Sequence, residues 1–183
     1  SVAIRYPERV SKVVVVGSPI VGSSLAPLLK IAGYRTSAFV LFNMMGPFRT
    51  FMKYYSRVIC SDPRFPEMMD RDLSRTTLES FLLSIASLRR TDLRPMLDQI
   101  KIPAMGMYGD RDKVVHPKQW EPLLQGIRQA YVERFPRAGH FPMLEEPQHF
   151  TEKLKQFLDQ EEMPSIVQAV ASPNPVPSVT LAP

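Results

Sequence analysis

The chain has 183 residues, of which 44 % are hydrophobic and 22 % are charged, so it can form the core of one ordinary globular domain. Its net charge is only +5, and most of its 23 basic residues are interleaved with 18 acidic ones. This pattern lacks the one-sided basic stripe of a nucleic-acid-binding surface, and we expect no nucleic-acid partner.

The apolar segments are too short to span a membrane. The longest, residues 38–48, is interrupted by Asn43 and Pro47, whereas a span needs about 20 helical residues. Cys60 is the only cysteine and has no partner at zinc-ligand spacing, so we expect no disulfide within the chain, no metal, no cofactor and a cytoplasmic location. No signal peptide is recognisable, and Ser1 in place of Met suggests that the natural protein starts earlier.

The N-terminal segment predicts a helix end that leads into a strand. Residues 1–10 have the pattern of the last turns of a helix that Pro7 ends. Residues 12–17 form a β-branched apolar run ended by Gly17, which is typical of a strand buried on both faces. A helix followed by such a strand is half of a βαβ unit, whose first strand would precede residue 1.

Residues 19–100 have a helical pattern and predict three or four helices, with breaks at Gly33, at 46–47 and at 62–63. The clearest helix spans residues 76–90 and has apolar residues at spacings of three and four. Its predicted buried face consists of Leu78, Phe81, Leu82, Ile85 and Leu88. We interpret 19–100 as a helical cap inserted between two units of a sheet.

Strand and helix patterns alternate after residue 100. Strands are predicted at 101–110 and 129–136, and helices at 120–127 and 147–162. The last helix is expected to bury Phe150, Leu154, Phe157 and Leu158. This alternation favours a parallel α/β sheet, with a core formed by 1–18 and 101–160. Residues 161–183 are rich in proline and are predicted to be a disordered tail.

Two short stretches follow the predicted C-terminal strands and contain chemically versatile side chains. Asp110 and Asp112 follow the first strand, and Gly139 and His140 follow the second. Functional groups of parallel sheets gather beyond the carboxyl ends of the strands, so neighbouring strands would bring a carboxylate beside the imidazole. A carboxylate that accepts the Nδ1 proton leaves Nε2 free to take a proton. Taken alone, His140 would also fit a surface loop that caps the following helix, but the paired stretches favour the acid and base.

The order of these elements resembles the C-terminal half of an α/β-hydrolase-fold protein, over about residues 1–160. Gly109 and Asp112 match the family's Gly-x-x-Asp loop, which implies that Asp112 is the catalytic acid and Asp110 a bystander. His140 matches the general base that follows glycine. Glu146 belongs to the Glu-x-Pro segment after it and is expected to start a helix.

One element of the family pattern is absent from these 183 residues. The α/β-hydrolase nucleophile lies in a G-x-S-x-G turn between a strand and a helix, and the chain contains no such motif. The sequence GSSLA at 22–26 is the nearest match, but Ala26 replaces the last glycine and the segment does not directly follow the strand, which argues against Ser24. Ser1 is expected in mid-helix. We therefore expect a Ser or Asp nucleophile upstream of Ser1.

The resemblance implies a hydrolase that acts on an ester or similar small apolar substrate, and we expect the present chain to be inactive by itself. The alternative is a non-catalytic protein of the same fold that binds a ligand or partner. If the 183 residues are the whole product, the strand near 13–17 would leave an exposed apolar edge. We expect His116 to be exposed, and His149 to lie on the polar side of the last helix with no role.

Overall fold

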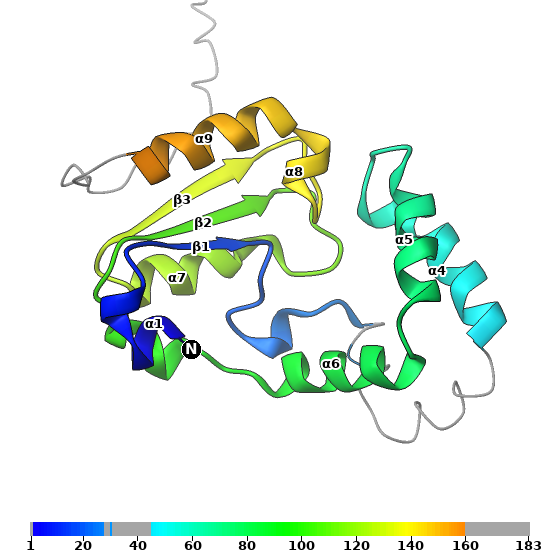
Figure 1. Ribbon diagram of the computed structural model, residues 1–183, viewed down its shortest axis with the longest axis horizontal. Coiled ribbons are helices and arrows are strands. Elements are labelled where there is room, and N and C mark those ends of the chain that lie inside the picture. Colours follow the sequence, from blue (N-terminus) through cyan, green and yellow to red (C-terminus); the bar gives the residue numbers. More distant parts are fainter. Residues whose placement is uncertain (1, 28–29, 31–44, 160–183) are drawn as a thin grey trace, which may run out of the picture.

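The computed structural model describes residues 2–27, 30 and 45–159 (Figure 1). The predicted tail 161–183, the helix break at Gly33 and the mid-helix assignment of Ser1 lie outside these residues. The strands are β1 (Val13–Val16), β2 (Ala104–Gly109) and β3 (Ala130–Phe135). The α-helices are α1 (Val2–Arg5), α4 (Met45–Ile59), α5 (Phe65–Ser74), α6 (Leu78–Arg90), α7 (Trp120–Gly126), α8 (Pro142–Glu145) and α9 (Pro147–Asp159). Short 3₁₀ segments are η1 (Pro7–Arg9), η2 (Gly22–Ser24), η3 (Arg94–Gln99) and η4 (Pro117–Gln119).

The three described strands form a parallel sheet in the order β1-β2-β3. The central strand β2 is buried along its whole length, as its continuous apolar run predicts. Both faces of β1 pack against apolar clusters, with Val13 and Val15 on one face and Val14 and Val16 on the other, but its residues are only half-buried, which is less than the sequence predicts. The reason is its position, because β1 has a described neighbour on one side only.

Helices cover both faces of the sheet, with α7 on one side and α9 on the other (Figure 1). Side chains of β2 alternate between these faces. Tyr108 packs against Leu123 of α7, whereas Met105 and Met107 pack in a cluster with Phe157 of α9. This two-sided packing confirms the α/β class with a parallel sheet.

The last helix buries a narrower stripe than its sequence predicts. Phe157 is buried, and Phe150 and Leu154 pack in the same cluster. Leu158 is 51 % exposed, so its predicted burial is wrong. Each helical residue turns by about 100°, and residue 158 therefore lies on the flank of a stripe centred on positions 150, 154 and 157. Lys12 donates to the carbonyls of Phe157 and Leu158, which places a cation at the negative end of the helix.

The helices α4 and α5 pack together beyond the carboxyl ends of the strands, and α6 lies next to them (Figure 1). In α6, Leu82 and Ile85 are buried as predicted, but Leu88 is 38 % exposed, so its placement on the buried face is wrong. At this position the backbone of α6, rather than the Leu88 side chain, lies against η2. The approach is so close that a Cβ at Gly22 of η2 would overlap the carbonyl oxygens of Leu88 and Arg89.

The boundaries of the predicted cap, 19–100, stay a prediction. Two residues inside that range, Ile20 and Leu97, belong to the same apolar cluster as Tyr108 and Leu123 of the core. No helix in the described ranges is long and apolar enough to cross a membrane.

Candidate active site

The site begins where β2 and β3 end side by side, at Gly109 and Phe135. The two following loops are joined by backbone hydrogen bonds, with Asp110 N donating to Phe135 O at 3.0 Å and Arg111 N donating to Ala138 O at 3.0 Å. Gly109 permits this close approach, because a Cβ there would overlap the carbonyl oxygens of Ala138 and Gly139. The loop after β2 and the loop after β3 therefore form one joined edge.

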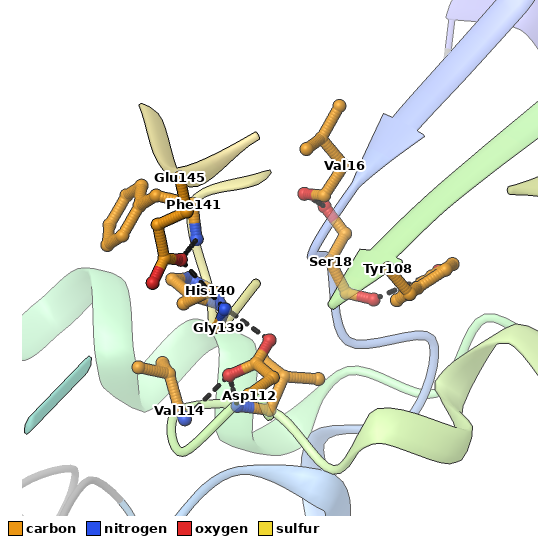
Figure 2. A network of polar contacts seen from close by, with 10 residues as sticks. Val16, Ser18, Tyr108, Asp112, Val114, Gly139, His140, Phe141 and Glu145 are labelled. Atoms are coloured by element: carbon orange, nitrogen blue, oxygen red, sulfur yellow. Dashed lines mark hydrogen bonds and ion pairs between the residues drawn. The ribbon is translucent and has the colours of Figure 1, made fainter. Parts of the chain in front are cut away.

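Asp112 and His140 meet at this edge (Figure 2). Their Oδ2 and Nδ1 atoms are 2.8 Å apart, and 2 % of the Asp112 side chain and 21 % of the His140 side chain are exposed. The second carboxylate oxygen of Asp112 accepts hydrogen bonds from Val114 N at 2.7 Å and Val115 N at 3.0 Å. Three donors thus fix the carboxylate, and the contact at Nδ1 leaves Nε2 of His140 available for chemistry.

His140 is also held by groups from two other elements. Gly17 at the end of β1 has φ +53° and lies against the imidazole, so that a Cβ there would be 3.2 Å from Nδ1. The backbone N–H of His140 donates to Ile59 O at the end of α4, at 3.4 Å. The Phe141 ring stands edge-on to the imidazole, with the ring centroids 4.8 Å apart.

A second carboxylate, that of Glu145, supports the histidine loop (Figure 2). Its Oε2 accepts hydrogen bonds from Gly139 N at 2.8 Å and Phe141 N at 3.4 Å. Its Oε1 accepts from Ser61 N at 2.9 Å and Ser61 Oγ at 2.8 Å. Sequence reasoning missed this residue, although the Glu-x-Pro segment after His140 was a signal that pointed to it.

Apolar side chains of α4, α5 and the two loops cluster beside His140. Within this cluster the Phe65 and Phe141 rings are 4.5 Å apart. Its buried members are Ile59, Cys60 and Phe65, and its half-buried members are Tyr55, Met69, Val114, Phe141 and Leu144. Burial raises the pKa of the Cys60 thiol to about 11, so this thiol is neutral at pH 7 and is not an activated nucleophile.

The other acidic residues near the site have structural contacts. Asp110 forms an ion pair with Arg134 at 2.9 Å and does not contact His140. Glu146 directly precedes α9, as expected, and its buried carboxylate accepts from Arg137 N at 3.1 Å.

The remaining candidates from the sequence lie outside the Asp112–His140 pair. His116 is exposed, as predicted, and its Nδ1 accepts from Lys118 N at 3.2 Å. His149 is half-buried and its Nε2 lies 2.9 Å from Glu133 Oε1, which is a structural contact between α9 and β3. Ser24 lies in η2, and its buried hydroxyl has no hydrogen-bond partner in the described part of the chain, so no base activates it. Among residues 2–27, 30 and 45–159, no His, Cys, Asp and Glu side chains are grouped to hold a metal ion.

A family model described as "alpha/beta hydrolase fold" matches residues 1–147. The chain belongs to the alpha/beta hydrolase fold family. Curated relatives in this family are hydrolases. A 2-hydroxy-6-oxononadienedioate/2-hydroxy-6-oxononatrienedioate hydrolase of Paraburkholderia phymatum is 28 % identical over 168 residues, which cover 86 % of this chain and 57 % of the relative. A 3-oxoadipate enol-lactonase of Acinetobacter baylyi is 26 % identical and matches 81 % of this chain and 54 % of its own length.

Solved structures show the same alpha/beta hydrolase fold. An esterase from Exiguobacterium antarcticum has a TM-score of 0.67 and 20 % identity, with 87 % of this chain and 63 % of the esterase covered. The enol-lactonase from Burkholderia xenovorans has a TM-score of 0.63 and 21 % identity, with 87 % and 60 % covered. The chain thus spans a little more than half the length of the curated relatives it matches.

Proposed function

We propose that the protein is a hydrolase that acts on an ester or a similar small apolar substrate. In this proposal Asp112 is the catalytic acid and His140 the general base. The observation that supports it most strongly is the 2.8 Å contact between Asp112 Oδ2 and His140 Nδ1 at the carboxyl ends of two parallel strands. A histidine that only occupies a surface loop needs no buried carboxylate beside it. It needs even less a carboxylate that two backbone N–H groups hold in place, as they hold Asp112.

In this proposal each of the two side chains has its own part in the reaction. Asp112 accepts the Nδ1 proton and so holds the imidazole in one tautomer. Nε2 then takes the proton of the nucleophile or of water as the new bond to the substrate carbonyl forms. The imidazolium is stabilised by the Asp112 carboxylate until Nε2 returns the proton to the leaving group. The cycle needs no net oxidation or reduction.

The nucleophile in this proposal is a Ser or Asp upstream of Ser1 in a longer polypeptide. Two observations support this placement. The 183 residues contain no G-x-S-x-G motif, and the chain spans 57 % and 54 % of two curated relatives. Without that residue the 183-residue chain is inactive.

We also propose that the complete protein is cytoplasmic.

The proposed substrate class is supported by the surroundings of His140 and by the relatives. The Phe141 ring stands edge-on to the imidazole and packs in one apolar cluster with Phe65 and Leu144, and these surroundings favour an apolar acyl or alkyl group over a sugar or a phosphate. The relatives' names describe a lactone and oxo-substituted dicarboxylates, which offer a carbonyl carbon to a nucleophile. They support attack at a carbonyl carbon, whereas the apolar group is inferred from the surroundings of His140 alone.

The test is hydrolysis of a short-chain p-nitrophenyl ester panel by the full-length protein and by three variants. His140→Ala and Asp112→Asn are expected to reduce kcat by roughly 10³-fold to 10⁴-fold, because each removes one part of a proton-transfer unit. His116→Ala is the matched control, since His116 is exposed and lies outside the pair, and it should retain full activity.

Ligand affinity is measured on the same proteins by calorimetry with a non-hydrolysable ester analogue. Loss of hydrolysis with unchanged affinity in His140→Ala supports the enzyme. Absence of hydrolysis in the parent protein, together with binding of the analogue, would support the non-catalytic alternative instead.

A further inference from the structure

The Glu145 carboxylate connects two segments that are far apart in sequence. Ser61, which follows the end of α4, donates both its backbone N–H and its hydroxyl to Oε1, at 2.9 and 2.8 Å. Gly139 and Phe141, the two residues that flank His140, donate their backbone N–H groups to Oε2, at 2.8 and 3.4 Å. One side chain therefore accepts four hydrogen bonds from two segments. Figure 2 shows the two that come from Gly139 and Phe141.

The end of α4 also supplies the acceptor for the middle residue of the histidine loop. His140 N donates to Ile59 O at 3.4 Å, so three consecutive backbone N–H groups, those of 139, 140 and 141, have acceptors. Glu145 Oε2 accepts two of these hydrogen bonds, and Ile59 O of α4 accepts the third. The loop that presents the imidazole is thus fastened to the helical region rather than only to the sheet.

We propose that Glu145 is a positioning residue, which holds His140 on Asp112 by fastening the histidine loop to the end of α4. The kinetic part of this inference rests on the proposed hydrolase function, and the geometric part does not. Glu145 acts through Gly139, Phe141 and Ser61, whose hydrogen bonds it accepts.

The physical basis is the number of donors that one carboxylate can satisfy. Hydrogen bonds to an ionised acceptor are stronger than neutral ones, and half-buried N–H groups that lose their acceptor are costly. Glu145→Ala leaves the N–H groups of Gly139 and Phe141 without a partner, so the loop shifts toward water. The His140 ring then leaves the position in which Gly17 and Asp112 confine it.

The experiment uses the full-length protein with Glu145→Ala, Glu145→Gln, Ser61→Ala and the control Glu152→Ala. Glu152 is an exposed carboxylate on α9 that contacts Gln156, so its removal tests the loss of a charge alone. Glu145→Gln retains one acceptor oxygen but places an amide N–H₂ toward donors. Its effect on the position of His140 and on kcat should therefore lie between those of the parent protein and of Glu145→Ala. Ser61→Ala removes only one of the four donors and should have the smallest effect.

Two readouts separate positioning from plain stability. The first is the ¹⁵N and Nδ1-proton NMR spectrum of the His140 ring, which reports the tautomer and the Asp112 contact. The second is the pair of kinetic constants for p-nitrophenyl butyrate. In Glu145→Ala we expect loss of the Nδ1-proton signal and a decrease in kcat of roughly tenfold to a hundredfold, with KM changed by less than about threefold.

The outcomes are distinguishable. Unchanged His140 ring signals and kcat in Glu145→Ala and Glu145→Gln, with only a lower melting temperature, would overturn the inference. If Glu145→Ala does not fold, Glu145→Gln and Ser61→Ala give the same two readouts at smaller amplitude, and parent-like values in both would overturn it. A parent protein without hydrolysis would refute the proposed function, while the ring signals would still decide the role of Glu145.

Discussion

Asp110 and Asp112 are two positions apart in one loop, yet they have opposite environments. The Asp112 side chain is 2 % exposed and accepts three hydrogen bonds, whereas the Asp110 side chain is 28 % exposed and pairs with Arg134, which is 45 % exposed. An exposed ion pair contributes little because water and salt screen it. A buried carboxylate with fixed donors instead holds both its loop and its partner.

This contrast predicts different effects of the same substitution. Asp110→Asn should lower the free energy of unfolding by less than about 1 kcal/mol and leave kcat unchanged, since it weakens only a screened ion pair. Urea unfolding and ester hydrolysis by the full-length protein are the measurements. A loss of activity comparable to that of Asp112→Asn would mean that the acid of the site is misassigned.

At the scale of elements, α6 illustrates how a helix start is encoded locally. Thr77 precedes the helix, and its Oγ1 accepts the backbone N–H of Ser80 at 3.1 Å. Such a cap satisfies one of the N–H groups that have no partner within the helix. Arg89 and Arg90 lie in its last turn, where cations suit the helix dipole.

Removal of this cap should destabilise the helix by a predictable amount. Thr77→Ala is expected to lower the free energy of unfolding by about 1 kcal/mol, with the activity retained. Thr76→Ala is the matched control, because Thr76 is exposed and its hydroxyl donates to a carbonyl of the preceding helix. We expect the control to change stability by less than about 0.5 kcal/mol, and equal effects in urea unfolding would contradict the cap.

At the scale of the whole molecule, β1 is the weak point of the sheet. Within the described residues it pairs with β2 alone, and all four of its valines are only half-buried. An unpaired apolar strand edge is a template for pairing with another chain. The chain spans little more than half the length of its curated relatives. These relatives therefore have additional residues that can supply further strands to the sheet.

We therefore expect the 183-residue chain, produced by itself, to associate. Sedimentation equilibrium should give a mass above that of one chain, and the chain should show no His140-dependent ester hydrolysis. A monodisperse monomer that melts cooperatively and hydrolyses esters through His140 would contradict this expectation.

The sequence by itself determined the features that depend on short-range patterns. The apolar run of β2 predicted a buried strand, because a parallel strand is covered on both faces, and the structure buries it along its whole length. The period of α6 predicted a helix, and the acid and base after two consecutive strands predicted a pair at one sheet edge. The structure brings Asp112 and His140 together there, while their catalytic roles stay a proposal.

Only the tertiary structure decided which side chains meet across long separations. Leu88 and Leu158 fit the helical period but are exposed, because burial depends on what lies opposite a helix face as well as on spacing. The Glu-x-Pro segment was a signal that pointed to Glu145, but the contact of Glu145 with Ser61 spans 84 positions, so local spacing could not predict it. Periodicity is a property of neighbouring residues, whereas the hydrogen bonds that hold His140 come from elements that packing alone brings together.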